Sequence, residues 1–519
     1  GVCVVLRHNG ALLGYGEAFG DNQDLLILAA NDALGEARKN AILRKLPEDI
    51  RNHAVSSIGI EVGIASEIMP IPSKNLERVA KKIITSVDGI AVRRGDSWDY
   101  RLPSQMTLSP FRSIVNHFEG MCIKVGAPAA AAIAHQFSSN ENITFYRLKF
   151  TAAYQHAKGE RVQLLYRGDE LVSLMKLQQE GIQEVADLLA SYLINSLWQG
   201  DEAFGITGTY QPETDRLNTI FAPVIAQAMA AEALLNYSSI PKCLHKQNAV
   251  DAYKRIMNDL AIVNNNESPI TGIVEQSFVV LASGNGITLS DKATSMIANC
   301  RDAVIKAAKQ MVNEANIPSK PLVRGVLSAA IAHVAKQEHS FTSLAEKVIE
   351  ACITATSDNE QTALIPWIAQ ASVDTTKLGG KVNIEFIKEL RSNALSSQVT
   401  DNSIPDLLGG YSLTTKEGSI VDARGIRVIP MLAELLPVET YTPLGNRFDE
   451  LQAMLLSARF ASQLTTTTER SNRFPNPNRA VGGVRSSPWD ATMRPEAAAM
   501  ALIGITKAID SIHAVARGE

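Results

Sequence analysis

The sequence predicts two domains of different class, an α+β domain over residues 1–175 followed by an all-α domain over residues 176–519. Three observations support this division. The chain has 519 residues, which is more than a single domain usually contains. Its composition, 45% hydrophobic and 20% charged, is that of a globular protein. Apolar residues alternate with a period of two in the first part of the chain and recur at helical spacing after it.

The first domain is predicted to combine strands with a few helices. Asn9-Gly10 between two apolar runs is typical of a β-hairpin. Residues 58–65 alternate like a strand with one buried face. Ser109 and Pro110 suit the cap and first position of a helix. In chain order we expect strands at 2–6, 11–14, 58–65, 89–94, 98–101, 146–155 and 161–167, and helices at 24–46, 76–84 and 109–120.

The motifs of this first part resemble those of the AMMECR-type domain. GVCVVLRHNGALLG, IGIEVGIASEIMPI, VDGIAVRRG, LPSQM and CIKVGAP follow one another in the family's order over residues 1–135. The resemblance implies the family's α+β fold. Where the family has Arg-Gly-Cys, this chain has Leu13-Gly14-Tyr15, so the cysteine that makes the family motif look catalytic is absent.

The second domain is predicted to consist of twelve helices joined by short breaks rich in Pro, Gly, Asn and Ser. Many of these helices carry Ala or Ser on a second face beside the apolar stripe. Packing on two sides favours the inner and outer helices of a closed ring of six hairpins, with a superhelical solenoid as the alternative. The expected helices cover residues 181–199, 216–236, 246–263, 271–283, 289–313, 319–337, 341–355, 358–371, 384–396, 426–436, 446–463 and 494–514.

This helical pattern resembles the α/α-toroid proteins, which include terpenoid cyclases, prenyltransferases and polysaccharide-active α/α barrels. The resemblance implies a toroid with a cleft at the open end of the ring. The aspartate-rich DDxxD and DxDD motifs of terpene cyclases are absent from the sequence, which argues against isoprenoid chemistry.

Charge and cysteine usage exclude several classes of partner. The net charge is -4, with 50 basic and 54 acidic residues and no basic stripe, so we expect no nucleic-acid partner. Uninterrupted apolar runs are too short for a membrane span. The cysteines are few and widely spaced, and His117 and Cys122 lack a third ligand nearby, so we expect neither a metal nor a cofactor. The abrupt start at Gly1 suggests a removed leader peptide, hence export, or a removed tag.

Two loops hold the candidate site. The first, residues 205–216, reads GITGTYQPETDR and precedes a long apolar helix. The second, residues 472–496, reads NRFPNPNRAVGGVRSSPWDATMRPE and is long enough to suggest either a functional loop or a plug for the helical ring. If both loops face the same end of the ring, their side chains converge there. The ligand-binding candidates are Tyr210, Glu213, Arg216, Arg485, Trp489 and Arg494, and the catalytic candidates are Tyr210, Asp215 and Asp490.

We expect this cleft to bind a carbohydrate or a peptide-like polymer, through aromatic stacking and charged contacts. The alternatives are a polysaccharide lyase or glycosidase and a protein-interaction scaffold. Asp215 and Asp490 have a plainer explanation as helix caps, with Arg485 and Arg494 pairing with them. Trp489 either packs as a buried ring or lines the ligand site. The sequence contains no HExxH, GxSxG or P-loop motif.

Overall fold

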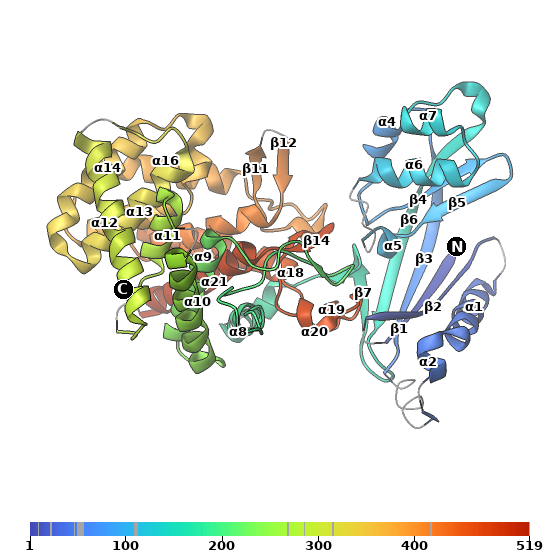
Figure 1. Ribbon diagram of the computed structural model, residues 1–519. Coiled ribbons are helices and arrows are strands. Elements are labelled where there is room, and N and C mark those ends of the chain that lie inside the picture. The colour runs from blue at the N-terminus through green and yellow to red at the C-terminus, as the bar shows by residue number, and fades with distance from the viewer. Residues whose placement is uncertain are drawn as a thin grey trace.

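The computed structural model describes residues 1–8, 10–20, 23–45, 47–48, 57–107, 113–177, 179–266, 269–284, 286–313, 316–415 and 418–517. It has two parts that lie side by side, a mixed part built on a β-sheet and a large helical part (Figure 1). The last strand of the sheet part ends at Glu170, and the first long helix of the helical part begins at Gln179. This architecture confirms the prediction of an α+β region followed by a largely helical region.

One antiparallel sheet of eight strands organises the first part. Its main path runs β2-β1-β3-β6-β4-β5, with β7 paired to β6 and β8 paired to β7. The long strand β6 bridges the sheet because it pairs with β3, β4 and β7. The strands are β1 (Val2–His8), β2 (Ala11–Ala18), β3 (Gly59–Ile71), β4 (Gly89–Arg94), β5 (Ser97–Arg101), β6 (Ile143–Gln155), β7 (Val162–Tyr166) and β8 (Asp169–Glu170).

Helices cover the two ends of this sheet. The helix α1 (Leu25–Lys39) packs on β1 and β2 through Ala29, Ala33 and Ala37, which are all buried. A Cβ added to Gly14 would lie 2.0 Å from the carbonyl oxygen of Ala33, so only glycine permits this close packing of helix on strand. At the other end, α6 (Ile114–Lys124) packs on β4 and β5, with the short α4 (Leu76–Ala80), α5 (Pro103–Thr107) and α7 (Ala129–Ile133) in the same region (Figure 1).

Several expected boundaries in this part need correction. The helix expected at 24–46 is divided at Asn40 into α1 and α2 (Ala41–Lys45). The helix α6 begins after Ser113, whose side chain accepts a hydrogen bond from the Val115 amide. The expected caps Ser109 and Pro110 lie outside the described residues, as does Asn9 of the confirmed β1–β2 hairpin.

Six helices of the second part contact one another in cyclic order, and the last contacts the first. Most of their residues are buried, as expected of helices packed on every side. In this order they are α9 (Val224–Ser239), α11 (Ile273–Leu281), α13 (Pro321–Gln337), α15 (Trp367–Lys377), α17 (Val428–Leu435) and α21 (Pro495–Arg517).

Six further helices pack outside these, each alternating in the chain with an inner one. The buried residues of α12, for example, form a single stripe with spacings of three and four from Ala293 to Met311, so its opposite face is solvated. The outer helices are α8 (Gln179–Asn195), α10 (Lys246–Asn266), α12 (Asp291–Asn313), α14 (Thr342–Thr354), α16 (Ile384–Ser396) and α18 (Arg447–Leu464).

Two expected helix starts in this part are wrong. The helix expected at 216–236 begins only at Val224, because Pro223 takes the N-cap position and the chain before it forms β10 (Arg216–Leu217). The helix expected at 358–371 is a 3₁₀ helix, η4 (Asp358–Leu364), followed by α15 after Pro366.

The loop at 472–496 contains regular structure, contrary to expectation. It includes the short helix α20 (Pro477–Ala480) and the hairpin β13–β14 (Arg485–Ser487 and Asp490–Met493). The strand β14 also pairs with β9 (Tyr210–Gln211), so the two loops expected to form the site share one small sheet, β10-β9-β14-β13. A separate hairpin, β11–β12 (Ser412–Thr415 and Gly418–Val421), precedes α17.

One described helix, α21, is long and apolar enough to cross a membrane by length and composition alone. Its most apolar window has a mean hydropathy of 1.4, and 61% of that window is buried inside the protein. The helix contacts α9 and α17 and forms part of the inner cycle. Its burial is that of a core helix, and it is the one such candidate among the described residues.

Candidate functional site

A cavity of about 720 Å³ opens at one end of the six inner helices. We refer to it as the cleft. The starts of α9, α13, α15, α17 and α21 all contribute to its lining. Its volume falls within the range of roughly 300–1,000 Å³ that is usual for ligand sites.

The floor of the cleft is apolar. Phe278 and Trp367 form its aromatic part, with ring centroids 5.1 Å apart in an edge-to-face arrangement. Met229 and Met500 lie on the inner faces of α9 and α21. Flexible methionine side chains adapt to ligands of different shape. The floor therefore suits an apolar group of a ligand.

The rim of the cleft is polar and charged. The 3₁₀ helix η6 (Ala423–Arg427) forms one side, and the β13–β14 hairpin with the start of α21 forms another. The exposed Arg424 is paired with Asp422, at 2.7 Å between Nη2 and Oδ2. The charged residues of the rim are Asp422, Arg424, Arg427, Asp490, Arg494 and Glu496.

Arg427 differs from Arg424 because it has no hydrogen bond or ion pair with any described residue. Its Nε atom is buried without a partner. Burial and repulsion from Arg424 lower the pKa of Arg427 to about 10, against the attraction of Asp422, so the side chain still carries its charge at neutral pH. The cleft thus holds a cation that the protein does not neutralise by direct contact within its described part.

Five inner helices begin at the cleft and direct the positive ends of their dipoles towards it. The N-cap residues of four of them, Pro223, Lys320, Pro366 and Arg427, make no side-chain cap hydrogen bond. Backbone amides at such ends favour anions. Helix orientation and Arg427 therefore contribute a positive potential at the same end of the six inner helices.

Three residues expected from the sequence line the cleft: Trp489, Asp490 and Arg494. Trp489 is half-buried, and its ring lies 5.3 Å from the guanidinium carbon of Arg167 in the sheet part. Asp490 accepts a hydrogen bond from the Thr492 amide at 3.0 Å. Because α21 begins at Pro495, Asp490 does not cap that helix, and this explanation of the residue is wrong.

Tyr210 and Asp215 lie in a separate place. The Tyr210 hydroxyl donates to Oδ1 of Asp215 at 2.9 Å, and Arg479 lies 4.9 Å over the Tyr210 ring. Burial and the bond to Asp215 raise the pKa of Tyr210, so it is a poor acid at neutral pH. Tyr210 lines a second cavity of about 260 Å³ beside Trp198.

The remaining candidates of the first loop are outside the cleft lining. Glu213 is half-buried, and Arg216 is exposed on β10, where it pairs with Gln211. Asp215 lies well before the N-cap Pro223, so it does not cap α9. The two loops therefore meet through their strands. Tyr210 of the first loop lines the second cavity together with Asn478 and Arg479 of the second loop, whereas only the second loop lines the cleft.

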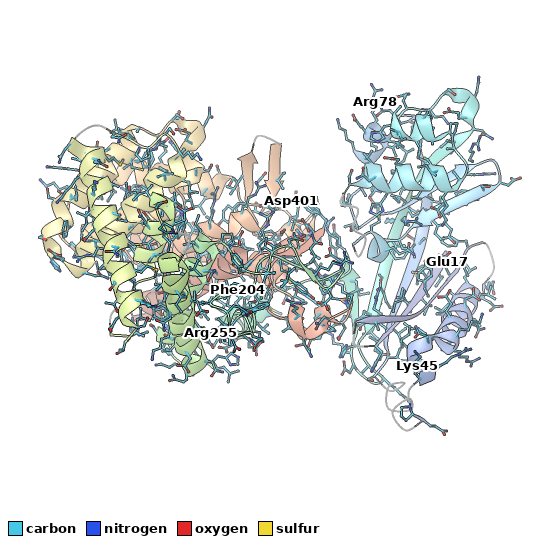
Figure 2. All side chains as sticks on the ribbon, viewed as in Figure 1. Glu17, Lys45, Arg78, Phe204, Arg255 and Asp401 are labelled. Carbon is cyan, nitrogen blue, oxygen red and sulfur yellow. The ribbon has the colours of Figure 1, made fainter. Side chains whose placement is uncertain are left out.

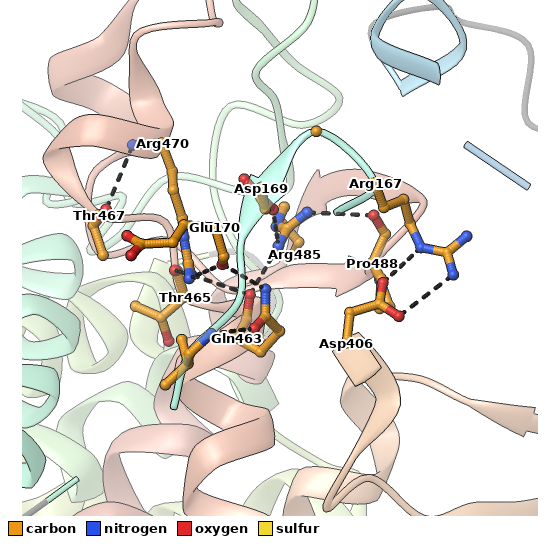
Figure 3. A network of polar contacts seen from close by, with 12 residues as sticks. Arg167, Asp169, Glu170, Asp406, Gln463, Thr465, Thr467, Arg470, Arg485 and Pro488 are labelled. Atoms are coloured by element: carbon orange, nitrogen blue, oxygen red, sulfur yellow. Dashed lines mark hydrogen bonds and ion pairs between the residues drawn. The ribbon is translucent and has the colours of Figure 1, made fainter. Parts of the chain in front are cut away.

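Arg485 is buried beneath the rim and binds the sheet part (Figure 3). Its Nη2 atom is ion-paired with Asp169 and donates to the carbonyl of Gln463 at 2.8 Å, and Nη1 donates to the carbonyl of Pro488 at 3.3 Å. Burial lowers the pKa of Arg485 to about 10, against the opposing effect of Asp169. Arg485 is therefore paired with Asp169 and not, as the sequence suggested, with Asp490.

Asp169 is the centre of a polar network between the two parts, which we call the interface network. Arg473 also pairs with Asp169, at 3.0 Å, and Arg470 donates to the carbonyl of Glu170 at 2.8 Å (Figure 3). Burial alone would raise the pKa of Asp169, but the three arginines Arg473, Arg485 and Arg470 outweigh it and hold the pKa below its ordinary value. The carboxylate is thus ionised where it is buried.

A second bridge joins the parts next to the cleft. Arg167, in the turn between β7 and β8, donates from Nε to Oδ2 of Asp406 at 2.6 Å. Both side chains are almost fully buried. Since the same guanidinium lies over Trp489, a residue of the sheet part supports a wall of the cleft.

An ionic cluster joins the inner helices, and of its members Lys336 is exposed. Lys507 pairs with Glu434 at 2.5 Å, and Lys336 pairs with Asp374 at 3.1 Å. Glu232 is buried with Oε2 unpaired, and burial raises its pKa. None of these side chains lines the cleft. Their contacts join α21 to α17 and α13 to α15, so the cluster acts within the ring.

In the sheet part, Tyr15 lies where the expected resemblance would place a cysteine. Its hydroxyl donates to Oε2 of Glu17 at 2.5 Å, and the Tyr100 hydroxyl donates to Oε1 at 2.6 Å. Burial and the bond to Glu17 raise the pKa of Tyr15. Burial, with Glu119 nearby, raises the pKa of Cys122 to about 12, so this thiol is a poor nucleophile.

Figure 2 shows the side chains on the ribbon, with Phe204 and Arg255 labelled on the helical part and Glu17, Lys45 and Arg78 on the sheet part. Phe204 stacks on Phe221 at 5.2 Å. Arg255 of α10 donates to the Trp198 carbonyl at 2.5 Å. These contacts fix the 198–221 segment on the outside of α9 and α10.

The sequence analysis did not identify four residues that line the cleft and supply its apolar floor and its unpartnered polar atoms: Phe278, Trp367, Arg427 and Ser487. Phe278 and Trp367 read as core positions of helices. Arg424 and Arg427 are three apart, which is typical of a solvated helix face. The one usable signal was Arg427 directly before the apolar run VIPML, since a cation at a helix start opposes the dipole.

Comparison with known proteins gives little further information. No protein-family model matches the chain, and no curated protein gives a significant match. Among solved structures, one similar chain is the uncharacterized protein PH0010 from Pyrococcus horikoshii, at 16% identity and a TM-score of 0.25. The match covers 32% of this chain and 78% of that chain. At that TM-score the likeness carries no argument about fold or activity.

Proposed function

We propose that the helical part is an α/α toroid whose cleft binds a polymer carrying both acidic and apolar groups, with a peptide-like chain favoured over a carbohydrate. One observation carries this proposal: a cavity of about 720 Å³ with an apolar floor beneath a charged rim. The cyclic contacts of the six inner helices support the toroid. The rim arginines and the helix starts support an acidic ligand.

The floor favours a peptide-like ligand over a sugar. Phe278 and Trp367 are 3% and 4% exposed, and each covers the other edge to face, so neither offers a flat ring for stacking on a sugar. Trp489 is the more accessible ring of the cleft. Apolar side chains of a peptide would instead fit between Met229 and Met500.

A polysaccharide lyase or glycosidase is the second candidate. Asp490 and Arg494 line the cleft together, which is the observation in its favour. Glycoside cleavage needs two titratable groups, one on each side of the substrate. Tyr210 and Asp215, the other proposed catalytic residues, line no part of the cleft. A binding function therefore has the stronger support.

The sheet part is proposed to be an AMMECR-like domain that supports the cleft. With Tyr15 and its glutamate partner at the position of the family cysteine, we assign this part no catalysis. Arg167 and the interface network connect it to the wall that contains Trp489. An interaction scaffold is a third possibility, and Ile60, Ile64 and Ile68 on β3 are its exposed apolar residues.

The proposal is tested by titrating immobilised protein with three polymers: a random copolymer of glutamate and tyrosine, polygalacturonate, and neutral dextran. We expect the copolymer to bind and Trp489→Ala to weaken that binding about tenfold, as for a central aromatic contact. Trp98→Ala is the matched control, because Trp98 is 44% exposed on the sheet part. It should leave binding unchanged.

The other outcomes separate the alternatives. Tighter binding of polygalacturonate would replace the peptide-like ligand with an acidic carbohydrate. New reducing ends or unsaturated products after incubation would establish the enzyme instead. If none of the polymers binds, or if Trp98→Ala and Trp489→Ala act alike, the cleft is not the site.

A further inference from the structure

Two residues that line the cleft, the half-buried Arg427 and the buried Ser487, each have a buried polar atom without a hydrogen-bond partner in the described part of the chain. Arg427 lines the cleft, and its guanidinium makes no hydrogen bond or ion pair within the described part of the chain. Ser487 is 4% exposed and also lines the cleft, and its Oγ atom has no partner there either. The elements that carry them, η6 and β13, are in direct contact.

Unpaired groups of this kind need an explanation, because most buried polar atoms in folded proteins find a partner. A charged donor is the costliest to leave unmatched. Arg427 provides several N–H donors in a fixed plane, and Ser487 can add an O–H donor. Together they require an acceptor, and an anionic one matches the charge.

The other charged rim groups are less suited to that role. Arg424 is already paired with Asp422 at 2.7 Å. Arg494 is exposed, so water screens its charge. Asp422, Asp490 and Glu496 are negative and would repel an anion placed against them. An anion in the cleft is therefore best accommodated beside Arg427, the residue before α17.

We propose that Arg427 and Ser487 form a carboxylate seat in the cleft, which holds the acid group of a ligand while its apolar group lies over Phe278 and Trp367. A carboxylate matches the planar, two-pronged geometry of a guanidinium. This inference rests on the proposed function and deepens it, because it names the chemical group that the cleft selects. The ligand class is a carboxylate with an apolar group a few bonds away.

The seat is tested with a small probe rather than a polymer. 4-Phenylbutyrate carries a carboxylate and an aromatic ring, and 4-phenylbutanol is its neutral counterpart. Calorimetric titration of the whole protein should show the acid binding about tenfold or more tightly than the alcohol. Arg427→Gln should remove this preference and leave alcohol binding unchanged. Ser487→Ala should reduce the preference by a smaller factor.

Two controls keep the result specific. Arg78→Gln removes the same charge from an exposed position on α4 and should retain the full preference. Arg427→Lys keeps the charge but loses the planar fork, so an intermediate preference is expected. Circular dichroism of every variant checks that it is folded.

The outcomes distinguish this inference from the proposed function. If wild type binds both probes equally, or if Arg427→Gln keeps the preference, the seat is wrong. Loss of the preference in Arg427→Gln supports the seat even if no glutamate–tyrosine copolymer binds, in which case the polymer proposal alone fails. If the copolymer binds but neither probe does, the seat fails and the polymer proposal stands.

Discussion

The interface network and the cleft are both rich in arginine, and they differ in what those arginines contact. At the interface, Arg485 and Arg473 bind the carboxylate of Asp169. In the cleft, Arg427 binds no described residue. Both regions include residues of one hairpin, β13–β14, so the difference does not come from distance along the chain. Paired arginines hold the two parts together, whereas an unpaired one is available to a ligand.

The largest effect should come from Arg485→Gln. The guanidinium is buried and is bound to Asp169 and to two backbone carbonyls, so its removal leaves both carbonyls unmatched and the buried carboxylate paired with Arg473 alone. We expect a loss of about 3–5 kcal/mol in the free energy of unfolding, measured in denaturant. Arg78→Gln on the exposed face of α4 should cost almost nothing. A loss below about 1 kcal/mol in Arg485→Gln would contradict the role of the interface network.

Asp169→Asn should change how the stability of the protein depends on pH, because Asp169 is the centre of the interface network. The folded-state pKa of Asp169 lies below its ordinary value of 3.8, so its stabilising contribution is complete above that value. The contribution is lost as the pH falls through the folded-state pKa. Melting temperatures of wild type and variant should therefore differ most at neutral pH and converge below pH 3.8. A gap that stays constant in acid would show that the ionised carboxylate is not the stabilising species.

Trp489→Ala lies between the two regions and should have an intermediate effect. The half-buried ring receives the Arg167 guanidinium at 5.3 Å on one side and lines the cleft on the other. We expect a loss of about 1–2 kcal/mol of stability together with weaker ligand binding. Thermal melts with and without ligand measure both. A loss of about 3–5 kcal/mol without any change in binding would make Trp489 a packing residue only.

Arg427→Gln should change stability least. No described partner is left unmatched when the charge is removed, so we expect the free energy of unfolding to stay within about 1 kcal/mol of wild type. Denaturant unfolding beside Arg485→Gln gives the direct contrast. A large loss would mean that Arg427 has a structural partner.

The class of each part could be predicted because its hydrophobic period extends over many residues. The same pattern predicted the wrong helix start where a proline sets the boundary. Leu217, Ile220 and Phe221 continue the apolar spacing of α9, but Pro223 fixes the helix start, and Phe221 stacks on Phe204 instead. Strands of two to four residues, such as β9 and β13, are too short to show alternation.

The candidate site was predictable only in part. Composition identified the 472–496 loop, and three of its residues line the cleft. Which cavity a loop side chain faces depends on strand register, here Met493 opposite Tyr210, and no local pattern encodes that pairing. The role of Arg427 depends on the absence of a partner among residues far away in the chain, so only the folded structure can indicate it.

The central claim is that an unpaired arginine marks the ligand site and a paired one marks the interface. Thermal melts of Arg427→Gln and Arg485→Gln, each with and without saturating 4-phenylbutyrate or 4-phenylbutanol, test it most directly. We predict that Arg427→Gln melts like wild type and responds to the acid no more than to 4-phenylbutanol, whereas Arg485→Gln melts at a lower temperature and still responds more strongly to the acid. The opposite assignment, with the stronger response to the acid lost in Arg485→Gln and kept in Arg427→Gln, would contradict the account.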